Sequence, residues 1–160
     1  MNELLITDKK RRIAVYRVSV EAIRPLRHRL LRPGLPPESA HFTGDHRLNT
    51  WHIGAFRPAE LGDEGLLICC ASFMAEPYKD ENAWQLRGMC TDPEHQGCGI
   101  GATLLGAAIK AILADSGVKL FWCNARVPAA GFYEKQGWRA DSKEFDIPTA
   151  GPHQKMFKWA

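Results

Sequence analysis

Three glycines at alternate positions, Gly97, Gly99 and Gly101, stand directly before an apolar run with helical spacing. The apolar residues of that run are Leu104, Leu105, Ala108, Ile109, Ile112 and Leu113. Small residues at a helix start let a ligand approach the backbone, and the first amides of a helix have no partner within it. Those amides and the positive end of the helix dipole favour phosphate. We therefore expect a loop that binds a diphosphate-containing ligand, rather than a glycine-rich turn without one.

Two nucleotide-binding motifs can be tested against this loop. A P-loop needs Lys and then Ser or Thr after its last glycine, whereas Ala102 follows here. The dinucleotide pattern G-x-G-x-x-A is matched by Gly97, Gly99 and Ala102. That pattern also needs an acidic residue after the next strand, where this chain has Asn124, and it normally opens the fold. A nucleotide-binding oxidoreductase is therefore disfavoured.

The loop resembles the acyl-CoA pyrophosphate loop of the GNAT superfamily of N-acetyltransferases. The family pattern, Gln/Arg-x-x-Gly-x-Gly/Ala, is matched by Gln96, Gly99 and Gly101. A second segment, NARVPAAGFYEKQGW at residues 124–138, resembles another GNAT signature, Ala-x-x-apolar-Tyr-x-x-x-Gly-aromatic. The matching positions there are Ala129, Phe132, Tyr133, Gly137 and Trp138. One predicted helix and one predicted strand separate the two motifs, as the family requires.

The resemblance extends over nearly the whole chain, and one position departs from it. The family often has Asn three residues before the alanine of its second signature, where this chain has Arg126, and Asn124 lies two positions earlier. The segments LRHRLLRPGLPPESAHFTGDHRLNTWHIGAF and EFDIPTAGPHQKM resemble the two ends of a bacterial GNAT subgroup. We expect residues 1–160 to form a single acetyltransferase domain. The expected α/β fold has a mixed, mostly antiparallel sheet of six to seven strands with helices on both faces.

Hydrophobic periodicity places the elements along the chain. The expected strands span residues 12–19, 51–56, 66–73, 83–90 and 120–123, followed by an antiparallel pair at Phe145 and 156–159 around a turn at 147–152. A polar turn with Gly62, Asp63, Glu64 and Gly65 would join the second and third strands. The expected helices span 20–31, a short stretch around 37–40, 102–116 closed by Gly117, and a short segment from Pro128 to before Gly137.

Composition limits the partners and the compartment. A net charge of +3 on 160 residues is too weak to indicate nucleic-acid binding. The five cysteines include no CxxC pair, which favours free thiols in a reducing cytoplasm. No apolar stretch suits a membrane span or a signal peptide. The spacing of His41, His46 and His52 matches no metal motif. We expect a cytoplasmic protein with no metal, nucleic-acid or membrane partner.

Two basic clusters stand out against this modest charge. The residues at 9–12, KKRR, are interpreted as a solvated face. The second cluster lies on the helix expected at 20–31 and just after it, beside the expected substrate side, and comprises Arg24, Arg27, His28, Arg29 and Arg32. It too can be a solvated face. The alternative is that it attracts an acidic substrate or the phosphates of the cofactor.

The GNAT resemblance implies acetyl-CoA as the acetyl donor. The pantetheine arm would lie along residues 88–91, pair with their backbone, and place an N–H near Cys90 as the oxyanion donor. The cofactor-binding residues that we expect are Met89, Cys90, Thr91, Gln96, Gly97, Cys98, Gly99, Ile100, Gly101, Ala102, Asn124, Ala129, Phe132 and Tyr133. Cys98, at a helix N-terminus, would contribute its backbone amide, although a nucleophilic thiol there is an alternative.

Tyr133 matches the family position that protonates the departing sulfur, and its alternative role is packing beside the cofactor. The general base is open between Glu144 and His153 in the C-terminal hairpin and Glu76 near a strand end, with His153 as the first to test.

The expected activity is acetyl-CoA-dependent transfer to a primary amine of a small molecule, by direct attack in a ternary complex. A non-catalytic acyl-CoA binding or sensing module is the alternative. Acceptor specificity would reside in residues 31–49, 77–82 and 147–153. The family resemblance also suggests a homodimer.

Overall fold

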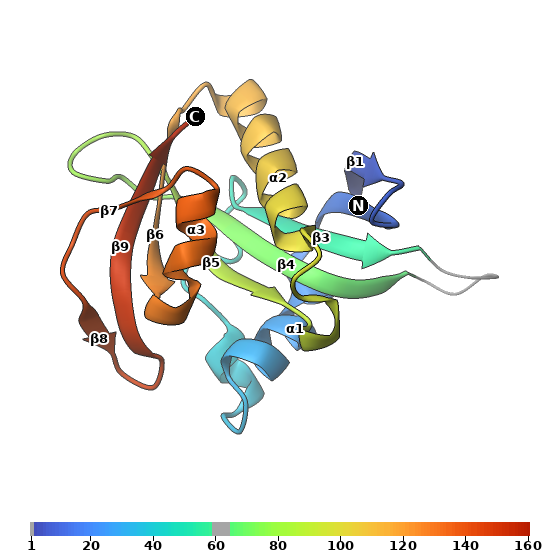
Figure 1. The fold of residues 1–160 in the computed structure, drawn as a ribbon, viewed down its shortest axis with the longest axis horizontal. Coiled ribbons are helices and arrows are strands. Elements are labelled where there is room, and N and C mark those ends of the chain that lie inside the picture. The colour runs from blue at the N-terminus through green and yellow to red at the C-terminus, as the bar shows by residue number, and fades with distance from the viewer. Residues whose placement is uncertain (1, 59–64) are drawn as a thin grey trace.

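The computed structural model describes residues 2–58 and 65–160, which form one mixed sheet with flanking helices (Figure 1). The strands are β1 (Glu3–Asp8), β2 (Ile13–Val18), β3 (Trp51–Arg57), β4 (Leu66–Ala75), β5 (Trp84–Thr91), β6 (Leu120–Arg126), β7 (Arg139–Ala140), β8 (Phe145–Ile147) and β9 (Gly151–Trp159). The helices are α1 (Val20–Leu31), α2 (Ile100–Ser116) and α3 (Ala130–Lys135), with 3₁₀ turns η1 (Pro37–Ala40), η2 (Pro93–His95) and η3 (Val127–Ala129).

The sheet has the order β1-β2-β3-β4-β5-β6-β9-β7, and β8 pairs with β9. Every pairing is antiparallel except the one between β5 and β6, so the expectation of a mixed, mostly antiparallel sheet is confirmed. The expected count of six to seven strands is too low, because the described residues contain nine. The two strands that were not expected are β1, an edge strand without apolar alternation, and β7, which has only two residues.

The helices begin and end close to where capping and periodicity place them. Helix α1 and the short turn η1 coincide with the expected ranges. Helix α2 begins at Ile100, two residues earlier than expected, and ends at Gly117 in the left-handed conformation (φ 69°). Gly101 and Ala102 therefore belong to its first turn rather than to the loop before it.

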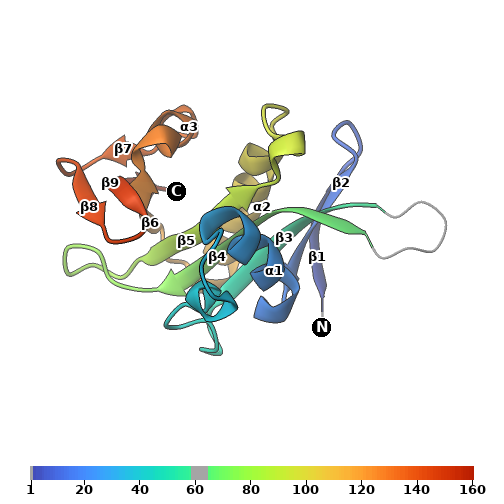
Figure 2. The same cartoon turned by 90° about the horizontal axis from the view of Figure 1, so that it is seen from below.

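Helices α1 and α2 cover opposite faces of the sheet (Figure 2). On one face, α2 packs its apolar residues, such as Leu104 and Ile112, against Ile13, Ile53 and Phe73 of the strands. On the other face, α1 packs residues including Ile23 and Leu26 against a smaller cluster that contains Cys70 and Cys90. The expected helices on both faces are confirmed, and the larger core lies under α2.

Strands β5 and β6 pair at their beginnings only. The parallel ladder joins Trp84, Gln85 and Leu86 of β5 to Phe121, Trp122 and Cys123 of β6, and no further register pair is found between them in the described chain. Strand β6 also pairs with β9 along its whole length, including the residues beyond the expected end at Cys123. The sheet therefore opens between β5 and β6, and Figure 2 shows the C-terminal strands turning away from β5.

A β-bulge accompanies this opening. The register between β4 and β5 shifts between Cys70 and Ser72, beside Gly88, whose φ is +62°. A Cβ at this position would lie 2.9 Å from the ring of Phe42 and 3.0 Å from the guanidinium of Arg27. A glycine is therefore required there by both conformation and space.

Two expectations remain, one about the turn after β3 and one about membrane spans. The hairpin turn between β3 and β4 includes Gly62, Asp63 and Glu64, which lie outside the described residues. No helix among the described residues is both long and apolar enough to cross a membrane.

Candidate active site

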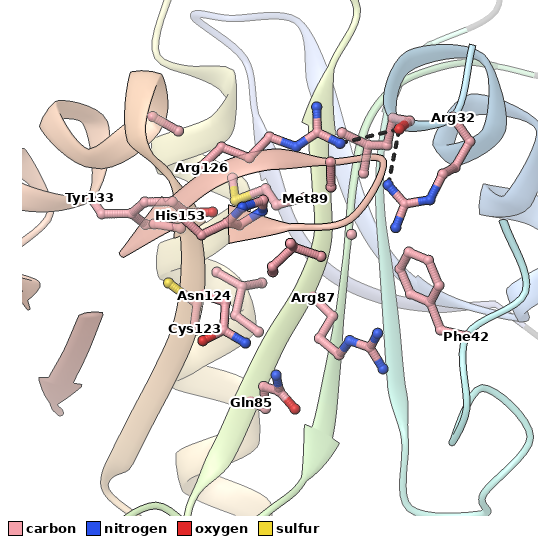
Figure 3. Close-up of a pocket in the computed structure, with 17 residues that line it drawn as sticks. Arg32, Phe42, Gln85, Arg87, Met89, Cys123, Asn124, Arg126, Tyr133 and His153 are labelled. Carbon is pink, nitrogen blue, oxygen red and sulfur yellow. Dashed lines mark hydrogen bonds between the residues drawn. The ribbon is translucent and has the colours of Figure 1, made fainter. Parts of the chain in front are cut away.

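A cavity of about 330 Å³ lies where β5 and β6 diverge (Figure 3). Of the expected site residues, five line this cavity: Met89, Asn124, Ala129, Tyr133 and His153. They come from β5, β6, the η3–α3 segment and β9, four separate parts of the chain. The fold thus brings the second GNAT-like segment to the strand that precedes the glycine loop.

Tyr133 faces the cavity from α3 and is otherwise enclosed. Its side chain is 7% exposed, with its ring 5.2 Å from that of Phe132 and 5.4 Å from that of Trp138. Burial, with smaller contributions from nearby thiols, raises the pKa of the Tyr133 phenol well above its ordinary value. The group therefore stays protonated at neutral pH and can donate a proton or a hydrogen bond into the cavity.

His153 is held in one orientation by its own hairpin. Its Nδ1 lies 2.7 Å from the carbonyl oxygen of Gly151, and a carbonyl can only accept, so Nδ1 carries the proton. In the neutral ring, Nε2 then keeps its lone pair. His153 is buried on the cavity wall, opposite Arg126 in the register of β6 and β9. This arrangement presents an acceptor nitrogen where a substrate amine can lose its proton.

Asn124 carries an unsatisfied polar atom on the cavity wall. Its Oδ1 is buried and has no hydrogen-bond partner among the described residues. Buried polar atoms without a partner are costly, so a ligand with an N–H group is the natural partner for this oxygen. The structure thus keeps Asn124 at the site although it is out of register with the family's asparagine.

The glycine loop leads directly into α2. Gly97 and Gly99 have φ of 79° and 83°, and Gly99 is the N-cap residue, where no side chain caps the helix. The helix amides at this end are therefore left for an anion. Gln96 donates from Nε2 to the carbonyl oxygen of Thr91 at 3.1 Å, which ties the loop to the end of β5.

Arg11, in the turn between β1 and β2, contacts the same loop. Its Nε donates to the carbonyl oxygen of Cys98 at 3.0 Å, and its Nη1 to Asp8, also at 3.0 Å. The Arg11 side chain is 37% exposed, as expected for a solvated face, but it also contacts the glycine loop. This guanidinium, which is paired with Asp8, places further N–H donors beside the amides of α2.

The other expected cofactor residues do not line the cavity. Ile100 is buried and Cys98 is exposed, with its Sγ 2.9 Å from the carbonyl oxygen of His95. The Cys90 side chain is buried in the α1-side core, so it does not line the cavity. Phe132 packs over the first turn of α2, 3.3 Å from where a Cβ on Gly101 would lie.

Two candidate bases lie away from the cavity. Glu144 is exposed just before β8, and Glu76 forms an ion pair with Arg47 at 2.6 Å. Neither residue lines the cavity. Of the three candidates for the general base, the structure brings only His153 to the site.

Sequence reasoning missed a polar wall on the α1 side of the cavity. Arg32, Phe42, Gln85 and Arg87 line it, and Arg126 lies at its upper rim (Figure 3). Only Arg32 belonged to a cluster with a proposed substrate role, and Arg126 was visible only as the departure from the family pattern. Phe42 lies in the segment 31–49 that was expected to set acceptor specificity, but nothing in the sequence singles it out, and no local signal marks Arg87.

These arginines are crowded together and partly desolvated. Burial, followed by the charges of Arg126 and Arg27, lowers the pKa of Arg32. Burial, followed by the charge of Arg27, likewise lowers the pKa of Arg87. Arginine nevertheless stays charged at neutral pH, so the cavity holds a concentrated positive potential.

The chain has clear relatives. Residues 59–140 match the family model described as "Acetyltransferase (GNAT) domain". The chain is 38% identical over 149 residues to the uncharacterized N-acetyltransferase YitI of Bacillus subtilis strain 168, covering 91% of this chain and 95% of the relative.

Solved structures share the fold. A putative N-acetyltransferase from Lactobacillus plantarum superposes with a TM-score of 0.72 at 20% identity, covering 92% of this chain and 97% of that one. A spermidine N-acetyltransferase from Vibrio cholerae, in complex with CoA and spermine, superposes with a TM-score of 0.66 at 13% identity, covering 92% and 95%. Together with the family model and the Bacillus relative, they show that the chain belongs to the GNAT superfamily and is an acyl-CoA-dependent N-acetyltransferase.

Proposed function

We propose that the enzyme transfers an acetyl group from acetyl-CoA to a primary amine of a small molecule, by direct attack in a ternary complex. The observation that carries this proposal is the joint placement of Tyr133 and His153 on the cavity between β5 and β6, beside the uncapped start of α2. A proton donor and a proton acceptor thus line one small space next to an anion-binding loop.

The residues present fit an acyl-CoA. The uncapped amides of α2 and the Arg11 guanidinium suit the diphosphate, and the open edge of β5 at residues 88–91 suits the pantetheine amides. The buried Oδ1 of Asn124 suits an amide N–H of the same arm. Bound there, the donor supplies the thioester whose acyl carbon the amine attacks.

The side chains divide the proton transfers between them. A neutral Nε2 on His153 accepts the proton that the attacking amine must lose. Tyr133, whose pKa is raised by burial, keeps its proton for the departing thiolate. A backbone N–H of the β5 segment near Cys90 stabilises the charge on the carbonyl oxygen, because backbone donors there are left without a β6 partner.

Steady-state kinetics on the Tyr133→Phe variant test the acid role. We expect kcat to fall by about 10²–10⁴, the usual worth of general acid catalysis, while the affinity for acetyl-CoA stays within a factor of about two or three. Tyr16→Phe is the matched control, because it removes the same hydroxyl from β2, where the ring packs on Phe56 away from the cavity. An unchanged kcat for Tyr133→Phe would remove this residue from the chemistry.

Calorimetric titration with acetyl-CoA, with NAD as the control ligand, tests the donor. Micromolar binding of acetyl-CoA and none of NAD is the expected result. Binding of acetyl-CoA without transfer to any amine in a broad panel would favour a non-catalytic acyl-CoA sensor instead.

A further inference from the structure

We infer that the acceptor is a primary amine that also carries an oxyanion, a carboxylate or a phosphate, and that Arg32 and Arg87 bind this group on the α1 side of the cavity. The inference rests on the proposed function and names the class of its acceptor. It is carried by the charges that line the cavity and by their lack of acidic partners.

The acidic and strongly basic side chains that line the cavity are all arginines. The lining contains three guanidinium groups, those of Arg32, Arg87 and Arg126, and no aspartate or glutamate. A protonated amine without a negative group would have to approach three cations with no carboxylate among the lining residues; Asp45 and Glu76 act on Arg87 only from outside the cavity lining. An amine that carries an oxyanion brings its own compensating charge.

The three lining arginines have donors to spare. Arg32 and Arg126 each donate to the carbonyl oxygen of Leu31, at 3.0 and 3.1 Å. Arg87 makes a long hydrogen bond of 3.4 Å to the carbonyl oxygen of Thr43. Within residues 2–58 and 65–160, no carboxylate lies within 4.0 Å of any of the three. Each guanidinium has five N–H groups, so most of them are left for a ligand.

The neighbouring Arg27, which does not line the cavity, contrasts with these three arginines because it has a carboxylate partner. Arg27 is wholly buried and pairs with the Asp45 carboxylate at 2.8 and 3.2 Å. Its Nη1 also donates to the carbonyl oxygen of Ala40 and its Nη2 to the Ser72 hydroxyl, whereas its buried Nε has no hydrogen-bond partner among the described residues. The buried cation is thus neutralised within the protein, whereas the cations on the cavity wall are not.

The ring of Phe42 contacts the guanidinium groups of both proposed binding residues, Arg32 and Arg87, on one side of the cavity. The guanidinium carbons of Arg87 and Arg32 lie 4.6 and 5.6 Å from the centroid of the Phe42 ring, and that of Arg27 lies 4.0 Å from it. Stacking restrains such groups and leaves their edges free to pair with a planar or tetrahedral oxyanion. Burial is the main cause of the lowered pKa values of Arg32 and Arg87, and the charges of neighbouring arginines add to it; a bound anion would offset both effects.

The phosphates of the donor are not the natural occupants of this wall. They belong at the glycine loop, which follows the end of β5, whereas Arg87 lies four residues before that end, about 13 Å away along a strand. Arg11 and the start of α2 already supply N–H donors at the loop. Figure 3 shows Arg32 and Arg87 across the cavity from His153, so an amine at His153 can extend its oxyanion toward them.

Matched pairs of amines, with and without the oxyanion, test the inference. The carboxylate arm compares L-phenylalanine with phenethylamine and L-leucine with 3-methylbutylamine. The phosphate arm compares glucosamine 6-phosphate with glucosamine, and spermidine serves as a purely cationic probe. Two readouts are taken: calorimetric binding to the CoA-bound enzyme, and release of free CoA thiol from acetyl-CoA.

We expect the anionic member of at least one arm to bind at least tenfold more tightly than its partner, and to show the higher kcat/KM. Arg87→Gln and Arg32→Gln should remove that preference and raise the KM for the acceptor about tenfold, with the KM for acetyl-CoA unchanged. Arg29→Gln, on the exposed side of α1 and paired with Asp92, is the matched control and should keep the preference.

The outcomes separate this inference from the proposed function. Transfer to amines with no preference for the anionic member, or a preference that both variants retain, would overturn the inference and leave the transferase activity standing. Arginine-dependent binding of the anionic compounds without CoA release would support the anion site and count against transfer. If no anionic compound binds more tightly than its partner, the anion site is refuted.

Discussion

The buried Arg27–Asp45 pair predicts a large loss of stability when one partner is removed. In Arg27→Met, the Asp45 carboxylate, whose side chain is 1% exposed, loses its two hydrogen bonds from the guanidinium. What is left near it is the backbone N–H of Phe42 at 2.9 Å and the Arg24 guanidinium at 3.8 Å. Met fills much of the same space, so the main change is a buried charge that has lost its closest partner rather than a cavity.

Removing one partner of a buried ion pair costs about 3–5 kcal/mol. The carbonyl of Ala40 and the hydroxyl of Ser72 also lose a donor in this variant, so we expect a value in the upper half of that range. Adding Asp45→Asn removes the stranded charge and keeps an acceptor for the Phe42 amide. We therefore expect the double variant to recover at least half of the loss, which a simple volume effect would not do.

Urea denaturation at pH 7 measures these differences, with Arg29→Met as the control. Arg29 lies on the same helix but pairs with Asp92 at the surface, where ion pairs contribute little. A loss for Arg27→Met no larger than that of the control would refute the reasoning, because the pair would then carry no stabilising interaction.

The pH dependence gives a second check with a definite sign. Burial by itself raises the pKa of Asp45, but hydrogen bonds from Arg27 and Phe42 outweigh it and hold the pKa below the ordinary value. The stabilisation is therefore present above the unfolded pKa, about 4, and is lost as pH falls through the lower folded value. In Arg27→Met the strongest of these hydrogen bonds are lost, so we expect burial to raise that pKa relative to the wild type. The stability gap between wild type and variant should narrow as pH falls from 7 toward 4, and a constant gap would contradict this account.

Two further predictions concern the glycine loop. In Gly99→Val, a side chain would enter a left-handed position with its Cβ 2.7 Å from Nε of Arg11. Acetyl-CoA affinity measured by calorimetry should therefore fall at least tenfold, with an unchanged circular dichroism spectrum. Gly106→Ala is the control, because open space surrounds that position, and this variant should bind acetyl-CoA normally. Of the five cysteines, only Cys98 is exposed, and burial raises the pKa of the Cys69 thiol to about 12. One thiol per chain should therefore react rapidly with Ellman's reagent, and bound acetyl-CoA should slow that reaction. An unchanged rate would place the acetyl donor elsewhere.

Local patterns predicted the helices and the loop because their causes are local. Helix α1 is an apolar stripe followed by a Pro-Gly pair, and α2 ends at Gly117 because a left-handed residue closes it. The anion-binding loop depends on glycines that are neighbours in the chain. The early start of α2 was missed because Gly101 was assigned to the loop, although a helix tolerates glycine in its first turn.

The misses in the sheet have long-range causes. Strand β1 is stabilised by its pairing with β2 and shows no alternation that the sequence could reveal. Strand β6 continues to Arg126 because its last residues pair with β9, although Asn124 and Arg126 read as the start of a loop. Polar residues at a strand end indicate a loop only when no partner strand holds them, and that partner lies about 30 residues away in the chain.

The arginines on the α1 side of the cavity also could not be identified from local sequence patterns. Arg27 and Arg32 lie five residues apart in one basic segment and look equivalent in the sequence, yet one is buried against Asp45 and the other faces the cavity. What separates them is a carboxylate in the loop before β3, which reaches the first and not the second. A net charge of +3 is too small to suggest an anionic ligand, but three cations without acidic partners around about 330 Å³ create a strong local field. The specificity that we propose for an anionic acceptor therefore depends on which arginines the fold leaves without a carboxylate, a property of the packed structure and not of the composition.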